Sequence, residues 1–194
     1  MKDDAGYMNV TKYQTDERSY ATLVIPALDF VSSPANGVEI ISLPHHVDLV
    51  VPLQDLSDAI ACRRIIRSFT SDPVPLAALS YLLWACSWVT DGSILHLSAP
   101  SFGFGKACMM QPAILRASVV FFWATVQYLT VWKYCLRGYR DIFLDAGNIY
   151  QNCYLVAGQY DLGVCSIRAF SNDEAVQALH LTDDQVLLYA AAFC

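Results

Sequence analysis

Lys133 and Tyr134 stand side by side at the end of a long apolar run, in the stretch VWKYCLRGYR (131–140). A lysine acts as a general base only when it is neutral, and burial or a nearby cation such as Arg137 lowers its pKa in that direction. A tyrosine can donate a proton or a hydrogen bond to a developing negative charge. The pair is therefore a candidate for proton transfer, although a lysine and a tyrosine at the edge of a core give the same pattern.

A second candidate is the segment RRIIRSF (63–69), which carries three arginines at the expected end of a helix. Arg63 and Arg67 are four residues apart, so they share a face if the helix continues. Such a pair, with Arg64 beside it, can bind a phosphate through charge-assisted, bidentate hydrogen bonds. The alternative is a solvated basic helix end, which interacts favourably with the helix dipole.

Three further segments are weaker candidates for a functional site. The small residues of APSFGFG (99–105) allow a backbone to approach a planar ligand, and Ser101 offers a hydroxyl, but a plain turn fits equally. Gly147 lies in a predicted helix, where glycine costs about 1 kcal/mol relative to alanine and permits close packing. The pair His45–His46 has no carboxylate or cysteine at ligand spacing, so we expect no metal site.

The elements that position these residues follow from the spacing of apolar side chains. Apolar residues three and four apart indicate helices, and β-branched or aromatic runs indicate buried strands. We expect Gly163 to end the longest helix and Ser171 with Glu174 to cap the last one. The expected helices cover 53–64, 71–88, about 139–160 and about 172–180; the expected strands cover 38–43, 117–126, 163–170 and 185–193; 1–36 and 90–107 are expected to be irregular. These elements predict one α+β domain over residues 1–194.

The amino-acid composition restricts the partners and the cellular location that we expect. Hydrophobic residues make up 55% of the chain and charged residues 15%, which favours burial of surface against a second subunit. The net charge is −6 without a basic run, so nucleic acid is not an expected partner. The apolar run 117–132 is shorter than the roughly 18–20 residues of a membrane span, and Gln127 interrupts it. Seven cysteines without a CxxC motif favour reduced, mostly buried thiols and a cytoplasmic location.

Several segments, in order along the chain, resemble one family. They are YMNVTKYQTDE (7–17), LSDAIACRRIIRSF (56–69) followed by PLAALSYLLWACS (75–87), APSFGFG (99–105), WKYCLRGYRDIFLDAGNIYQN (132–152) and YDLGVCSIRAF (160–170). Together they resemble the nitroreductase superfamily of FMN-dependent oxidoreductases. Within it, they are most similar to the SagB-type dehydrogenases, which oxidise azolines (thiazolines and oxazolines).

The resemblance implies a nitroreductase-like α+β sandwich with a central mixed sheet flanked by helices. It implies a homodimer that binds FMN at each subunit interface. Residue by residue, it implies that Arg63 and Arg67, with Arg64 beside them, bind the phosphate or ribityl part of FMN. It implies further that Ser101 and Gly103 line the flavin, that Ser166, Ile167 and Ala169 lie along the isoalloxazine ring, and that Lys133 and Tyr134 are catalytic.

The expected function is oxidation of an azoline, free or carried on a peptide, to an azole by hydride transfer to flavin. Lys133, with Tyr134, would remove the proton. A first alternative is an NAD(P)H-dependent nitroreductase or quinone reductase. A second is a non-catalytic homologue that acts as a scaffold or partner subunit, because few residues separate Gly105 from Ala117.

Overall fold

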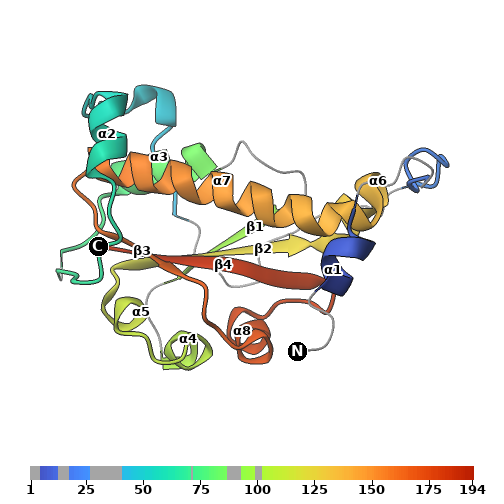
Figure 1. Ribbon diagram of the computed structural model, residues 1–194. Helices are drawn as coiled ribbons and strands as arrows, with labels where there is room; N and C mark the ends of the chain where they lie inside the picture. The colour runs from blue at the N-terminus through green and yellow to red at the C-terminus, as the bar shows by residue number, and fades with distance from the viewer. Residues whose placement is uncertain (1–4, 13–17, 27–40, 71, 87–92, 99–101) are drawn as a thin grey trace.

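The computed structural model describes residues 5–12, 18–26, 41–70, 72–86, 93–98 and 102–194 (Figure 1). Its centre is a four-stranded sheet in the order β1-β2-β4-β3. The strands are β1 (Ser93–Ser98), β2 (Val119–Val126), β3 (Val164–Ile167) and β4 (Gln185–Phe193). All three pairings between these strands are antiparallel, whereas the family resemblance implied a mixed sheet.

Helices cover both faces of the sheet (Figure 1). On one face lie the long helix α7 (Gly138–Gln159), α3 (Leu76–Cys86) and α2 (Leu56–Cys62). On the other lie α4 (Phe102–Ala107), α5 (Pro112–Arg116) and α8 (Asn172–Leu179). Three further short elements are α1 (Ala5–Val10), the 3-10 helix η1 (His46–Asp48) and α6 (Gln127–Tyr134), which a 3-10 turn, η2 (Cys135–Arg137), joins to α7.

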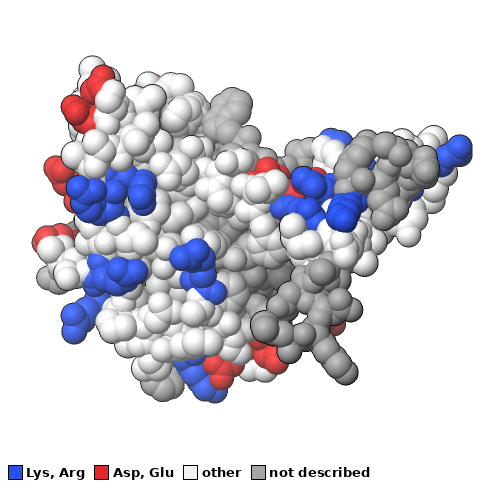
Figure 2. All heavy atoms as spheres, viewed as in Figure 1, with Lys and Arg blue, Asp and Glu red and all other residues white. Residues whose placement is uncertain are grey.

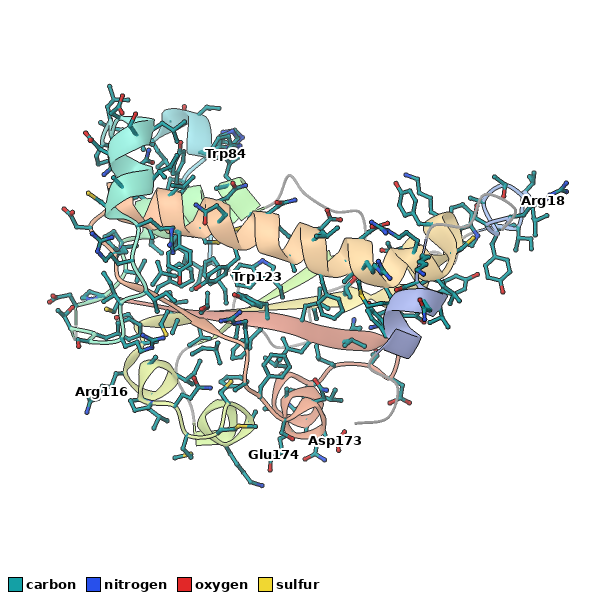
Figure 3. All side chains as sticks on the ribbon, in the orientation of Figure 1. Arg18, Trp84, Arg116, Trp123, Asp173 and Glu174 are labelled. Carbon is teal, nitrogen blue, oxygen red and sulfur yellow. The ribbon has the colours of Figure 1, made fainter. Side chains whose placement is uncertain are left out.

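Strand β2 is buried on both faces because helices cover both. Phe121 and Trp123 pack in the core beneath α7, and Figure 3 shows Trp123 between α7 and the sheet. Phe122 and Val120 point the other way, into the core formed with α4, α5 and α8. A strand covered on both faces needs apolar residues at successive positions, because its side chains alternate between the faces. This explains the sequence VVFFWATV.

The structure confirms the α+β class and most of the strongly periodic elements. The helix expected at about 139–160 is α7, and the strand expected at 185–193 is β4 with the same bounds. The strands expected at 117–126 and 163–170 are the shorter β2 and β3. Ser171 caps α8 as expected, with its Oγ accepting a 3.5 Å hydrogen bond from the Glu174 backbone N–H.

The prediction of an irregular segment over 90–107 was wrong. Residues 93–98 form β1, which pairs with β2 along its whole length, and residues 102–107 form α4. The glycines that suggested a loop are compatible with α4 because the helix packs tightly. Gly105 is buried, and a Cβ built on it would lie 2.6 Å from Leu115 Cδ2. Phe104 packs on Phe122 with ring centroids 5.1 Å apart.

Two predictions near the N-terminus also failed. The segment 1–36 was expected to be irregular but contains α1, which Arg140 of α7 holds through Thr11 Oγ1 (2.5 Å) and the carbonyl of Met8. The strand expected at 38–43 lies partly outside the described residues, and its described part, 41–43, is not a strand. There the chain runs past α3, where Ser80 Oγ donates a 2.6 Å hydrogen bond to the carbonyl of Pro44.

None of the helices in the described part of the chain combines the length and hydropathy needed to cross a bilayer. Four cysteines, Cys86, Cys108, Cys153 and Cys165, are buried, whereas Cys62 is exposed. Burial raises the pKa of the Cys108 thiol to about 11, so this side chain is a protonated, apolar core residue at neutral pH.

Candidate functional site

The arginine segment lies at one end of the sheet, beside β3. Helix α2 ends at Cys62 with Arg63 as its C-terminal cap, so Arg63 and Arg67 do not share a helical face as the sequence suggested. The chain after α2 instead runs along β3, where the Ile66 backbone N–H donates a 2.9 Å hydrogen bond to the carbonyl of Val164. Gly163 permits this approach, because a Cβ there would lie 3.1 Å from Ile66 Cγ2.

Basic side chains gather at this end of the molecule. Figure 2 shows Lys and Arg side chains where α2, β3 and α5 meet, with Asp and Glu side chains along the outer edge, and a second basic group near α1 and α6. Arg64 donates to the carbonyl of Ala61 at 3.2 Å and so turns back toward its own helix. In the described part of the chain, no carboxylate lies within ion-pair distance of Arg63, Arg67 or Arg168. Their charges are therefore available to an anionic ligand.

Tyrosines of α7 and β4 adjoin the arginines. The Arg63 guanidinium lies 5.1 Å from the ring centroid of Tyr154, in a cation–π contact. Tyr150 precedes Tyr154 by one helical turn, and their ring centroids are 4.7 Å apart. Tyr189 of β4 packs on Tyr150 at 4.6 Å. The result is a wall of aromatic rings beside the cationic end of the sheet.

Two phenol groups in this wall are buried. The hydroxyl oxygens of Tyr150 and Tyr154 are inaccessible, and neither has a hydrogen bond of ordinary geometry in the described structure, although the two lie near each other and Tyr150 lies near the Ser166 hydroxyl. Tyr150 as a whole is only 5% exposed. Burial is the main cause that raises its pKa, Tyr154 adds to the effect, and the nearby Ser166 hydroxyl opposes it. The hydroxyls of Tyr150, Tyr154 and Ser166 therefore form a buried polar group behind Arg63, which a ligand reaches only if these side chains move.

We call this group the arginine–tyrosine cluster. It comprises the cations and polar side chains that converge at the β3 end of the sheet: Arg63, Arg67, Arg168, Tyr150, Tyr154, Tyr189 and Ser166. Burial raises the pKa of Tyr189, and the Ser166 hydroxyl and the Arg168 charge partly offset this, so Arg168 lies near the cluster. Arg67 likewise offsets the effect of burial on the pKa of Cys165, but Cys165 belongs to the core on the opposite face of the sheet, so Arg67 lies at the edge of the cluster. Such a cluster can bind an anion and stack against a planar ring.

The other residues assigned to a cofactor by resemblance are dispersed. The Ile167 side chain is fully buried in the core on the opposite face of the sheet, so only its backbone could contact a ligand at the cluster. Ala169 is exposed, and its carbonyl accepts a 2.9 Å hydrogen bond from Gln111. Gly103 is exposed on α4, in the layer opposite α7. Ser101 lies outside the described residues.

Lys133 and Tyr134 end α6, with the Lys133 ammonium 5.0 Å from the ring centroid of Tyr134. Both side chains are exposed. The Arg137 guanidinium, expected to act on Lys133, instead pairs with Asp141 at 3.1 Å. Cys135 follows the pair with φ 55° and ψ −153°, a conformation that costs a non-glycine residue about 1–3 kcal/mol. Strain of this kind often accompanies functional residues and fixes the direction of the chain after Tyr134.

Within a single chain, the Lys133–Tyr134 pair lies far from the arginine–tyrosine cluster. Lys133 and Tyr134 lie before the first residue of α7, Gly138, whereas Tyr154 lies near its end. At 1.5 Å rise per residue, Gly138 and Tyr154 are about 24 Å apart along the helix. Figure 1 shows the same separation, with α6 at one end of the molecule and α2 and β3 at the other.

The tyrosines and Arg168 were not among the site residues predicted from the sequence. Tyr150 and Tyr154 are four apart on a confidently predicted helix, so a shared face was foreseeable, but aromatic residues on such a face usually belong to a core. Arg168 lies between two residues that the resemblance did single out, Ile167 and Ala169. A cation directly after a buried strand was the signal that could have identified it.

A small pocket lies elsewhere, between α6, α7 and the sheet. Its lining consists of Trp123, Thr125, Thr130, Ile142, Asp145, Ala146, Ile149 and Leu188. Asp145 is its one carboxylate, and burial, followed by repulsion from Asp141, raises the pKa of that group. The pocket holds no cation, so it does not resemble an anion site.

Comparison with known proteins finds a family whose sequence model matches the half of the chain that holds most of the arginine–tyrosine cluster. The sequence model described as "Nitroreductase family" matches residues 96–193, which is half of the chain. The chain belongs to the nitroreductase family. The matched region holds α6, α7, β3 and β4, and therefore every residue of the arginine–tyrosine cluster except Arg63 and Arg67.

Individual relatives agree with this membership. The Methanocaldococcus jannaschii protein MJ1384, named as a nitroreductase, is 25% identical in an alignment 174 positions long that covers 69% of this chain and 88% of that protein. A structure from Anabaena variabilis, also named as a nitroreductase, matches with a TM-score of 0.64 at 19% identity over 72% of this chain. The NADPH:FMN oxidoreductase of Vibrio harveyi, solved with NAD+, matches with a TM-score of 0.60 at 18% identity over 71% of this chain.

The two solved structures establish the fold. This chain covers 37% of the Anabaena chain and 66% of the Vibrio harveyi chain, less than two thirds of each. The nitroreductase family is a family of oxidoreductases, and the expected nitroreductase-like α+β fold is confirmed.

Proposed function

We propose that this chain is an FMN-dependent oxidoreductase whose cofactor binds at the arginine–tyrosine cluster. The observation that carries the proposal is the position of Arg63, which is exposed, has no carboxylate partner in the described structure and lies over the ring of Tyr154. A ligand that fits must be anionic, must form hydrogen bonds and must present a flat surface. FMN has a phosphate, a polar ribityl chain and a planar ring, so the residues present fit it.

Each part of FMN has candidate binding residues within the cluster. Arg63 and Arg67 would hold the phosphate or ribityl part, as the resemblance implies, and Arg168 adds a third cation directly after β3. The hydroxyls of Tyr150 and Tyr154 would donate to the polar chain or to ring oxygens only after the side chains around them move. Bound FMN would supply hydride transfer, and the protein would supply orientation, exclusion of water and local charge.

The second part of the proposal is a homodimer formed through α7. The side of α7 that faces away from the sheet exposes Phe143 (55%) and Leu144 (59%), large apolar side chains that water solvates poorly. Gly147 follows on α7, and a Cβ built there would have no neighbour within 4 Å. Packing within the chain thus gives no reason for a glycine in this helix, whereas close approach of a second α7 does.

Leu144→Glu tests this dimer. A buried, unpaired carboxylate at the interface should raise the dissociation constant of the dimer at least about 100-fold, because desolvation of the charge is not offset. Light scattering across a concentration series measures it. Met109→Glu, between α4 and α5 at the opposite face, is the control and should leave the dimer unchanged. A wild-type protein that stays monomeric throughout the series contradicts the proposal.

Of the two reactions open to such an enzyme, NAD(P)H-dependent reduction fits the described chain with fewer further requirements. It needs a flavin site and room for a nicotinamide, but no additional protein base. The name of the Vibrio harveyi relative, an NADPH:FMN oxidoreductase, supports this reaction by analogy of fold. Reduction of nitroaromatics or quinones would then follow.

Azoline dehydrogenation remains the second candidate because of Lys133 and Tyr134. In one chain Lys133 is exposed and lies at the far end of α7 from the cluster, so it could act only on a flavin held by the partner subunit. A dimer through α7 would also cover part of α6 and could bury Lys133, as a neutral general base requires. The strained backbone at Cys135 supports a functional role for this end of α6.

An anaerobic experiment separates the two reactions. The FMN-loaded protein is mixed with NADPH or with a thiazoline-containing peptide, and flavin absorbance is followed. We expect NADPH to bleach the flavin, at a rate that Lys133→Ala leaves unchanged. Bleaching by the peptide alone, abolished by Lys133→Ala, would instead establish the dehydrogenase. A flavin that stays oxidised with both would show that the chain is a non-catalytic member of the family.

Tyr150→Phe should have opposite effects on stability and on FMN binding. Without FMN, loss of a buried hydroxyl that has no hydrogen bond of ordinary geometry should raise the free energy of unfolding by about 1 kcal/mol. FMN affinity should fall about 2- to 10-fold, because one neutral hydrogen bond is lost. Urea unfolding and flavin fluorescence titration measure the two quantities, with the exposed Tyr20→Phe as control. A less stable protein with unchanged affinity would show that the hydroxyl serves the fold alone.

A further inference from the structure

Two buried sulfur atoms lie much closer than a non-bonded contact. The Sγ atoms of Cys86 and Cys153 are 2.8 Å apart. Non-bonded carbon atoms pack optimally at about 3.5–4.0 Å, and sulfur is larger than carbon. A disulfide bond is about 2.05 Å long, so the two sulfurs need to approach by only about 0.8 Å to form one.

We propose that Cys86 and Cys153 are a redox-active thiol pair that oxidises to an intramolecular disulfide linking α3 to α7. Cys86 is the last residue of α3, and Cys153 lies in the second half of α7. The adjacent residues already hold these helices together, because Asn152 Nδ2 donates a 3.1 Å hydrogen bond to the carbonyl of Ala85. The pair is thus preorganised by contacts that do not depend on the sulfur atoms.

The accessibility of the two cysteines sets the order of the exchange. Cys86 is 7% exposed and Cys153 is fully buried, so Cys86 reacts first. The oxidant is a low-molecular-weight disulfide. The Cys86 thiolate attacks one of its sulfurs, which forms a mixed disulfide and releases one small thiol. The Cys153 thiolate then attacks the Cys86 sulfur, which forms the protein disulfide and releases the second small thiol.

Electrons and protons balance in this exchange. The protein thiols lose two electrons, and the two small thiols released carry those electrons and the two protons. Burial, together with the neighbouring Cys86, raises the pKa of the Cys153 thiol, so the second step is slow at neutral pH and needs a long incubation.

The disulfide would fix the turn of α7 that carries Tyr150 and Tyr154. It would also close a long loop of chain, from the end of α3 to Cys153, which restricts the unfolded state. A loop of this length should raise the melting temperature of the oxidised protein by about 5–15 °C. This inference does not depend on the proposed flavin chemistry.

The test uses the full-length wild-type chain incubated for hours with oxidised glutathione or with dithiothreitol. The protein is then unfolded, alkylated and mapped by peptide mass spectrometry. We expect a Cys86–Cys153 cross-link in the oxidised sample, both residues alkylated in the reduced one, and the rise in melting temperature. Cys86→Ser and Cys153→Ser should abolish that rise, whereas Cys108→Ser, a buried cysteine in the opposite core, should retain it.

Two outcomes overturn the proposal. Alkylation of both Cys86 and Cys153 after oxidation would show that no disulfide forms. Glutathione that remains attached to Cys86 would show that Cys153 does not attack it. Both outcomes are read from the wild-type protein, so the proposal stays testable even if a serine variant fails to fold.

Discussion

Replacement of Arg63 by glutamine should weaken FMN binding by about 10- to 100-fold. A hydrogen bond to a charged group contributes about 1.5–3 kcal/mol, and each 1.4 kcal/mol changes an equilibrium constant tenfold. Arg63 has no carboxylate partner in the described structure, and its guanidinium lies over Tyr154. Its removal should therefore cost the ligand more than it costs the fold. Titration of FMN fluorescence at fixed ionic strength measures the loss.

The matched control is Arg18→Gln, which removes the same charge from the opposite end of the molecule. Figure 3 shows Arg18 beyond α6, at the end away from α2 and β3. FMN affinity in this variant should stay within about twofold of wild type, because an exposed charge at a distance is screened by salt. Equal losses in both variants would mean that net positive charge, rather than the cluster, attracts the cofactor. An unchanged affinity in Arg63→Gln would remove Arg63 from the site.

Phe121→Ala should cause the largest loss of stability among these variants. Phe121 is fully buried in the core beneath α7, with its ring centroid 4.7 Å from that of Phe193 and 5.7 Å from that of Trp123. Truncation of a buried phenylalanine removes transfer free energy and leaves a cavity, which together cost about 3–5 kcal/mol. The melting temperature should fall by about 6–20 °C. Urea unfolding and calorimetry of the FMN-free protein measure both quantities.

Leu76→Ala supplies the comparison for this variant. Leu76 is half-exposed at the start of α3, so its truncation should change the free energy of unfolding by no more than about 0.5 kcal/mol. A loss of less than 1 kcal/mol in Phe121→Ala would show that β2 does not lie at the centre of a packed core.

Local sequence patterns predicted those elements whose periodicity is sustained. Helix α7 keeps one apolar face over six turns, and β4 is apolar from Val186 to Phe193, so both were identified with nearly the right bounds. Strand β1 and helix α4 were missed because their local signals, glycine and serine, indicate a loop. Their structure depends on pairing with β2 and on the fit of Gly105 beneath Leu115, which no local window contains.

Local sequence patterns were also insufficient to predict how the site residues come together. The arginines after α2 and the residues of β3 were singled out along the sequence, and the structure places the two segments side by side through Ile66 and Val164. The contact of Arg63 with Tyr154 joins residues far apart in the chain, so no spacing rule could reveal it. The separation of Lys133 from the cluster by the length of α7 could not be predicted either. Residues of one sequence motif can lie at opposite ends of a helix.

The most direct test of the central claim is FMN retention by the purified wild-type chain. The protein is incubated with excess FMN, desalted and examined by visible absorbance with quantification of total protein. Binding at the arginine–tyrosine cluster predicts one FMN per chain, and the Arg63→Gln variant treated in parallel should lose most of it. A wild-type protein that leaves the column colourless, with all FMN in the small-molecule fraction, would contradict the account.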